Sequence, residues 1–165
     1  MLARFPERID GHEYLAAVFE ARGDHTAAAK HYRCAAAGMT PAEPSYDPGY
    51  VPYLLHHADV HTRLSLGVQA TDLDKLTDSV AGDLIRGHLD EAAHQIEILL
   101  LGAPDHHVVV ERRGQLCEIR GDRSGAARDF RHAADLARAH GGDPAHVDYL
   151  TTRANWLDPP PPPRS

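Results

Sequence analysis

A short segment that recurs three times limits what this chain can fold into. Its copies begin at Arg22-Gly23-Asp24, Arg86-Gly87-His88 and Arg120-Gly121-Asp122. After the glycine, each copy has a small pair at five and six residues, a bulky apolar residue at nine and an apolar pair at twelve and thirteen. The second and third glycines lie 34 residues apart, and the first and second lie 64 apart. A period in this range indicates stacked helical hairpins.

The residues of the segment itself specify a helix-turn-helix. Glycine ends one helix, the arginine before it complements the carboxyl end of that helix, and the aspartate after it caps the next helix. We therefore predict an all-α array of about seven or eight helices within a single domain, 1–158. Its hairpins are expected at about 10–38, 71–101 and 105–140, and no strand is expected.

Other local signals set the remaining boundaries. Asp10, Thr71 and Asp105 are predicted to cap helices, and Asp143-Pro144 is predicted to begin a capping helix over 143–157. The segment 39–70 is expected to be irregular, with a proline-rich loop followed by a third helix that has no Arg-Gly partner. The prolines of 159–165 predict a disordered, extended tail.

Composition excludes several classes of protein. The formal net charge of −7 argues against a nucleic-acid backbone or an anionic membrane as the main partner. No apolar run approaches the roughly 18 residues that cross a bilayer, and the first residues carry no signal-peptide core. Cys34 and Cys117 form neither a disulfide framework nor a metal quartet. A cytoplasmic location and no resident cofactor are expected.

The spacing resembles that of the tetratricopeptide repeat (TPR) family, whose helix-turn-helix unit is 34 residues long. Aromatic and small residues match the family pattern in the first and last hairpins, and Ile and Leu replace them in the middle one. The matching positions are Leu15, Ala16, Phe19, Gly23, Ala28, Tyr32, Ala35, Gly87, Ala92, Ile96, Leu99, Gly114, Gly121, Ala126, Phe130 and Ala133. The resemblance covers roughly 100 residues and implies an α-solenoid with an irregular third helix and a terminal capping helix.

The same resemblance implies a peptide-binding concave face lined by the first helix of each hairpin. Carried over by register, the polar residues expected at this face are Asp10, Glu13, Glu20, Asp74, Glu111, Gln115 and Glu118. Most of them are acidic and none is basic, so a basic peptide or protein is the expected partner. The alternative is that these acids form an ordinary solvated surface.

The histidines suggest a second function. His57 and His61 are separated by four residues, which places both on one helix face, and Asp59 is nearby. Two such ligands hold zinc or copper only if a third converges from elsewhere. His107 and Glu111 form a similar pair. There is no phosphate loop, nucleophile elbow or Cys-x-x-Cys motif, so an enzyme is less expected than a scaffold.

Two hypotheses therefore remain open. The first is a protein-interaction module that binds a basic segment along an acidic helical face, with self-association through the terminal helices as a possible addition. The second is a small helical metal-dependent or accessory enzyme that uses His57 and His61 with neighbouring carboxylates.

Overall fold

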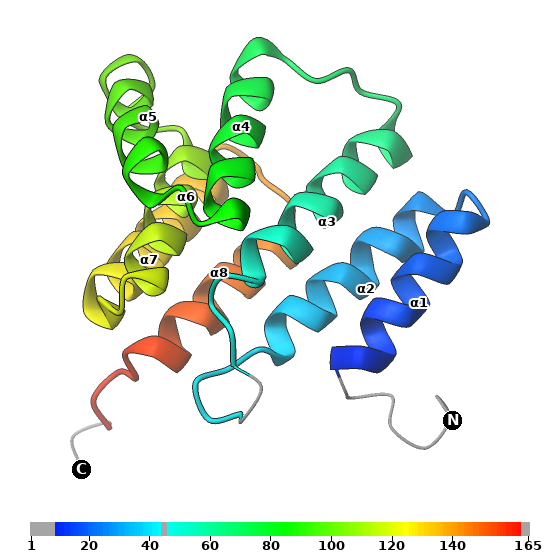
Figure 1. The fold of residues 1–165 in the computed structure, drawn as a ribbon, viewed down its shortest axis with the longest axis horizontal. Coiled ribbons are helices and arrows are strands. Elements are labelled where there is room, and N and C mark those ends of the chain that lie inside the picture. Colours follow the sequence, from blue (N-terminus) through cyan, green and yellow to red (C-terminus); the bar gives the residue numbers. More distant parts are fainter. Residues whose placement is uncertain (1–8, 44–45, 163–165) are drawn as a thin grey trace. The chain divides into compact units, whose positions relative to one another are not determined.

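The computed structural model describes residues 9–43 and 46–162, and every regular element in this part of the chain is an α-helix (Figure 1). The all-α prediction is confirmed. The helices are α1 (Ile9–Ala21), α2 (His25–Gly38), α3 (Val51–Leu66), α4 (Asp72–Arg86), α5 (Leu89–Gly102), α6 (His107–Ile119), α7 (Arg123–Ala139) and α8 (Pro144–Leu157). Among the described residues, none of these helices is both long and apolar enough to cross a membrane.

The chain divides into two compact units, with the boundary between residues 87 and 88. The first unit contains α1 to α4 and the second contains α5 to α8. The predicted hairpin over 71–101 is therefore shared between them, because α4 belongs to the first unit and α5 to the second.

In the first unit, α2 lies between two partners and packs against both α1 and α3, while α3 also packs against α4. Small side chains make these contacts possible, since Ala28, Ala35 and Ala58 are fully buried where the helices meet. Leu54 and Leu55 of α3 complete this core. The third helix, expected to be irregular, is thus a regular packing partner of α2.

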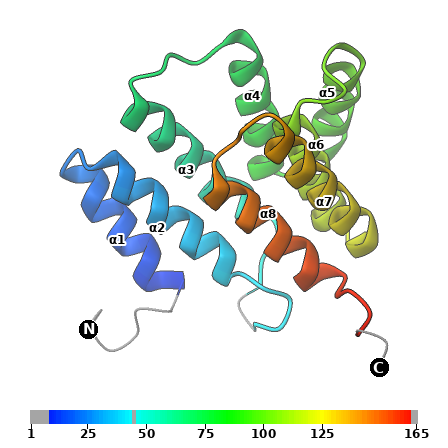
Figure 2. The same cartoon turned by 180° about the vertical axis from the view of Figure 1, so that it is seen from behind.

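The second unit likewise has one helix packed between two others. Its α7 packs against α6 and α8, and α5 packs against α6 (Figure 2). Phe130 of α7 is fully buried, and a Cβ atom added at Gly114 of α6 would lie only 3.0 Å from its ring. The close contact of α6 with α7 therefore depends on a glycine at this position.

The recurring turn has the predicted structure in both units. Asp24 accepts a hydrogen bond from the backbone N–H of Ala27 at 3.1 Å, and Asp122 accepts one from Gly125 at 2.9 Å. Gly23 and Gly121 have φ angles of 74° and 83°, a region that favours glycine. Both turns end one helix and begin the next within three residues.

Two further caps are confirmed and two are wrong. Thr71 and Asp74 form a reciprocal capping box at α4, and Asp143 accepts a hydrogen bond from the Ala145 N–H at 3.0 Å. Asp105 does not cap α6, because this helix follows His106, which makes no side-chain cap. Asp10 lies within α1 instead of preceding it.

The structure describes two of the segments predicted from the sequence only in part. Residues 159–162 form no helix or strand, as the proline run predicts, while residues 163–165 lie outside the described part. Of the loop 39–49, residues 44 and 45 are likewise outside it.

The three helices α1–α3 and the three helices α6–α8 are two copies of one pattern, here called the first copy and the second copy. In each copy, two glutamates stand ten and three residues before the turn glycine: Glu13 and Glu20, Glu111 and Glu118. The third helix of each copy shares a Val-x-Tyr-Leu-x-x-x-Ala sequence, at residues 51–58 and 147–154. The central aromatic residue is Tyr32 in one copy and Phe130 in the other.

Candidate functional site

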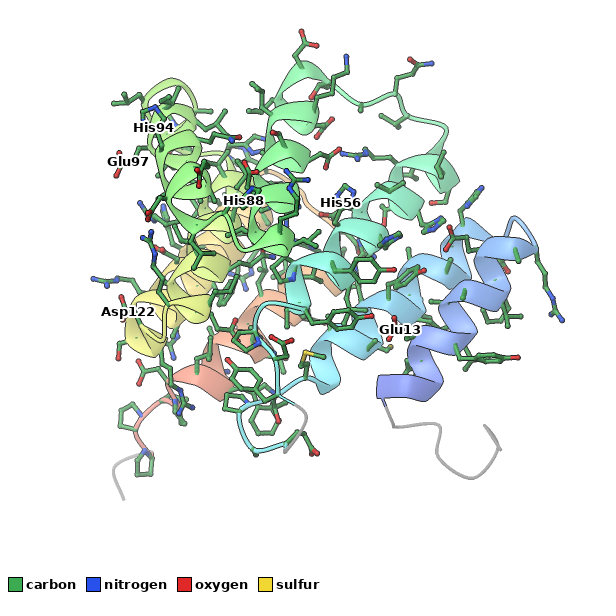
Figure 3. The ribbon with its side chains drawn as sticks, viewed as in Figure 1. Glu13, His56, His88, His94, Glu97 and Asp122 are labelled. Atoms are coloured by element: carbon green, nitrogen blue, oxygen red, sulfur yellow. The ribbon has the colours of Figure 1, made fainter. Side chains whose placement is uncertain are left out.

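Two glutamates of α1 face side chains of α2 and α3 in the first copy. The carboxylate of Glu20 accepts a hydrogen bond from the Tyr32 hydroxyl at 2.9 Å, and its Oε2 atom lies 3.4 Å from Nε2 of His61. Glu13, labelled in Figure 3, accepts a hydrogen bond from the Tyr50 hydroxyl. The turn at Gly23 sets this geometry by folding α2 back along α1, so that Tyr32 reaches Glu20.

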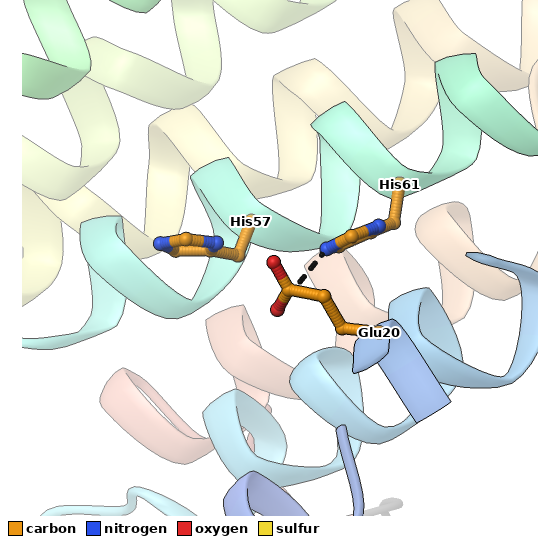
Figure 4. A group of neighbouring side chains, drawn as sticks. All are labelled: Glu20, His57 and His61. Carbon is orange, nitrogen blue, oxygen red and sulfur yellow. Dashed lines mark ion pairs between the residues drawn. The ribbon is translucent and has the colours of Figure 1, made fainter. Parts of the chain in front are cut away.

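Two histidines of α3 converge on the same carboxylate. One ligand atom each from Glu20, His57 and His61 lie within 4.8 Å of one another (Figure 4). The spacing of His57 and His61 places both rings on one face of α3, as the sequence predicts. The third group is Glu20 from α1, and Asp59 is not part of this cluster.

Aromatic rings surround the two imidazoles. Tyr32 stacks on His57 and on His61, with ring centroids 5.1 and 5.8 Å apart, and the Tyr53 ring lies 4.5 Å from His57. Nδ1 of His61 lies 3.0 Å from Nδ1 of His25, the first residue of α2. These contacts leave His61 only 4% exposed and hold its ring in one orientation.

The cluster favours an ionised carboxylate beside a neutral imidazole. Burial alone would raise the pKa of Glu20, but the hydrogen bond from Tyr32 and the nearby His61 and His57 lower it below its usual value. Burial, followed by the neighbouring His56, lowers the pKa of His57 and outweighs the opposing effect of Glu20. Burial and the bond to Glu20 raise the pKa of the Tyr32 phenol, so this hydroxyl remains a donor.

The corresponding glutamates of the second copy are buried in an internal network. Arg153 of α8 donates from Nε to Oε2 of Glu118 at 3.2 Å and from a terminal nitrogen to the other oxygen. Oε2 of Glu111 lies 2.9 Å from Nε2 of His146, also of α8. Glu111 and Glu118 are 0% and 3% exposed. This part of the expected partner-binding face is therefore occupied by the chain's own α8.

The remaining residues of that α6 face join the same network. Gln115 is buried, accepts a hydrogen bond from Arg112 at 3.1 Å and donates one to Glu111 at 3.4 Å. His107, paired with Glu111 by sequence spacing, is half-buried, and burial lowers its pKa. The imidazole that lies within hydrogen-bonding distance of Glu111 belongs to His146 instead.

Two predicted site residues have other positions. Asp74 closes the capping box with Thr71 and lies 3.8 Å from Arg63, so its local partners belong to the start of α4 and to α3. The side chain of Asp10 lies outside the described residues. Of the expected partner-binding residues whose side chains the structure describes, Glu20 lies in the cluster with His57 and His61, and Glu13 accepts a hydrogen bond from Tyr50 next to α3.

Several residues that shape both sites were not identified from the sequence. They include Tyr32, Tyr50, Tyr53 and His25 around the first cluster, and His146 and Arg153 around the second. The shared Val-x-Tyr-Leu-x-x-x-Ala sequence of α3 and α8 would have pointed to those on or next to these two helices, namely Tyr50, Tyr53, His146 and Arg153. It aligns Tyr50 with His146 and His57 with Arg153, each opposite an equivalent glutamate.

Comparison of the chain with protein-family models, with curated proteins and with solved structures finds no match.

Proposed function

We propose that this chain is a TPR-like protein-interaction module that binds a basic segment of a partner protein at the acidic face of its first copy. The face consists of Glu13 and Glu20 of α1 with Tyr53 and His57 of α3. The supporting observation is the difference between the two copies: Glu118 has an internal arginine, whereas Glu20 has a histidine at the equivalent position.

The ion pair of Glu118 with Arg153 shows how a cation neutralises the carboxylate that is equivalent to Glu20. Arg153 uses two nitrogens against the two carboxylate oxygens, the two-point geometry that makes guanidinium–carboxylate pairs strong and directional. In the first copy, no lysine or arginine of the described residues forms an ion pair with Glu13 or Glu20. The side chain of Glu20 is 44% exposed, so an arginine from a partner has access to it.

Charge favours the same class of partner. The net charge of −7 attracts a basic segment over a distance that shrinks as salt is added, because the Debye length is about 10 Å at 0.1 M ionic strength. The attraction therefore raises the association rate at low salt, and close pairing with Glu13 and Glu20 supplies specificity.

The experiment compares binding of a labelled arginine-bearing peptide with that of its glutamine counterpart, by fluorescence anisotropy in EDTA. We expect Glu13→Gln with Glu20→Gln to abolish the preference for the arginine peptide. A matched control is Asp72→Asn with Asp90→Asn, which removes two almost fully exposed carboxylates elsewhere. Equal binding by wild type and the Glu13/Glu20 variant would discard the proposed face.

A cytoplasmic location and self-association belong to the same proposal. In the described part of the chain neither Cys34 nor Cys117 forms a disulfide, which suits a reducing compartment. Large apolar side chains are exposed at the end of α3 and just after it, namely Leu64, Leu66 and Val68. A second molecule of the protein would cover these side chains in a dimer. Light scattering of wild type and of Leu66→Ser tests this, with a shift toward monomer expected in the variant.

A further inference from the structure

We propose that Glu20, His57 and His61 bind one divalent transition-metal ion, with zinc as the reference ion. The three side chains offer a carboxylate oxygen and two imidazole nitrogens, a donor set that zinc accepts in proteins. They come from two helices that both pack on α2, so the same core contacts that hold the fold also hold the three donors.

The distances fit such an ion after small side-chain movements. A tetrahedral zinc with bonds of about 2.0–2.1 Å places its ligand atoms about 3.4 Å apart. Oε2 of Glu20 and Nε2 of His61 already lie at 3.4 Å. All three ligand atoms lie within 4.8 Å of one another, so small side-chain rotations would bring them to the spacing that a bound ion requires.

The two copies differ at the residues that would hold the ion. Aligned through the Val-x-Tyr-Leu-x-x-x-Ala sequence, His57 replaces Arg153 and His61 replaces Leu157, while the glutamate is kept as Glu20. The second copy thus has a guanidinium charge against its glutamate. In the first copy, His57 and His61 offer two nitrogen donors to the equivalent glutamate, Glu20. A bound cation there would supply the positive charge that Arg153 supplies in the second copy.

Surrounding contacts would orient the donors. Metal-binding histidines usually engage a partner through their second ring nitrogen, and this fixes the tautomer and the ring plane. His61 directs Nε2 toward Glu20 while its Nδ1 atom lies 3.0 Å from Nδ1 of His25. The Tyr32 hydroxyl holds one oxygen of Glu20. His61 and Glu20 therefore each have a supporting partner, His25 and Tyr32 respectively.

Three protein ligands leave a fourth position for water or another ligand, in contrast to the four protein ligands of closed structural zinc sites. Glu20 is the exposed member of the cluster and His61 the buried one, so this position lies on the Glu20 side. The ion also shares Glu20 with the proposed partner face. We therefore expect zinc and an arginine-bearing peptide to compete.

The test is a calorimetric zinc titration of the full chain after removal of metal with EDTA. We expect a specific site of one ion per chain that is weakened at least about tenfold by Glu20→Gln and by His57→Ala. His94→Ala removes an exposed histidine of α5 and serves as the control, with unchanged binding. Glu20 is exposed and Gln retains a hydrogen-bond acceptor for Tyr32, so this variant is expected to fold.

A second measurement separates direct ligands from supporting residues. Cobalt(II) bound at this site should show the absorption of a low-coordinate ion with nitrogen ligands, and His61→Gln should change this spectrum. His25→Phe preserves the ring but removes the partner nitrogen, and should weaken zinc affinity about 10- to 100-fold.

The outcomes distinguish the metal site from the partner face. Zinc affinity that is the same in wild type, Glu20→Gln and His57→Ala, or no specific site at all, would overturn the metal proposal. Glu13→Gln should weaken zinc binding much less than Glu20→Gln does, because Glu13 is not one of the three ligands. Peptide binding is measured in EDTA, without metal. An absence of peptide binding therefore leaves the result of the zinc titration unaffected.

Discussion

Arg153 of α8 and Glu118 of α6 form a two-point ion pair, with the two side chains 1% and 3% exposed. Ions this deeply buried lose their hydration, so the fold depends on their mutual pairing. The equivalent residues of the first copy, His57 and Glu20, form no such pair. This difference between the copies leads to the first two predictions.

Removing one partner of the buried pair should be costly. We expect Arg153→Ala to lower the free energy of unfolding by about 3–5 kcal/mol, because the buried Glu118 loses the arginine that contacts both of its carboxylate oxygens. Replacing both residues by apolar side chains of similar volume, Arg153→Met with Glu118→Leu, should cost less than the single change. Urea denaturation followed by circular dichroism measures both. A double variant less stable than Arg153→Ala would show that the pair does not act as a unit.

An arginine at position 57 of the first copy, equivalent to Arg153 of the second copy, should occupy Glu20 and block its binding site. We expect His57→Arg to pair with Glu20, to abolish the preference for an arginine-bearing peptide and to weaken zinc binding at least about tenfold. The measurements are peptide anisotropy in EDTA and zinc calorimetry. His56→Arg introduces the same residue at the neighbouring position of α3 and is the control. If His57→Arg retains peptide preference and zinc affinity, neither ligand uses Glu20 as proposed.

The buried Glu111 should make stability depend on acid pH. Burial raises the pKa of Glu111, but the charge of His146 and its hydrogen bond with Glu111 outweigh burial and lower this pKa below its usual value of about 4.5. A lowered carboxylate pKa means that the unfolded state binds the proton first. The stabilisation is therefore complete above about pH 4.5 and is lost as pH falls further.

Glu111→Gln removes this titration. The difference in unfolding free energy between wild type and Glu111→Gln should shrink as pH is lowered from 6 to 3, measured by urea denaturation at each pH. A difference that stays constant over this range would contradict the assigned role.

The turn glycine should be required for its backbone conformation. Gly121 has a φ angle of 83°, where a Cβ atom costs roughly 1–2 kcal/mol. Gly121→Ala should therefore lower stability by about that amount. Gly102, the last residue of α5, has no positive φ angle and open space around it, so Gly102→Ala should be neutral or slightly stabilising. Thermal unfolding distinguishes the two, and equal midpoints would contradict the argument.

The sequence predicted the helices well because their signals are local. Asp24, Thr71, Asp122 and Asp143 cap the helices that follow them, and each lies next to the backbone atoms it contacts. Asp105 missed the cap position by one residue, since the N-cap of α6 is His106, whose side chain makes no capping hydrogen bond.

The site was predicted only in part because its contacts join residues distant in sequence. The spacing of His57 and His61 was visible, but Glu20 lies on another helix and was assigned to a different site. The burial of the α6 residues was also not predicted from the sequence. Glu111, Gln115 and Glu118 have the composition of a solvated face, and only the position of Arg153 and His146 on α8 shows that they are enclosed.

The duplicated helices have a consequence for which substitutions the chain tolerates. The second copy is constrained at its glutamates, because each needs a matching change on α8 to remain neutralised. The first copy keeps the same helices together through Ala28, Ala35 and Leu54, without a buried Arg–Glu ion pair at the equivalent position. Its exposed Glu20 is thus less constrained than the buried Glu118, which makes the Glu20 end of α1 a suitable place to engineer a new ligand specificity.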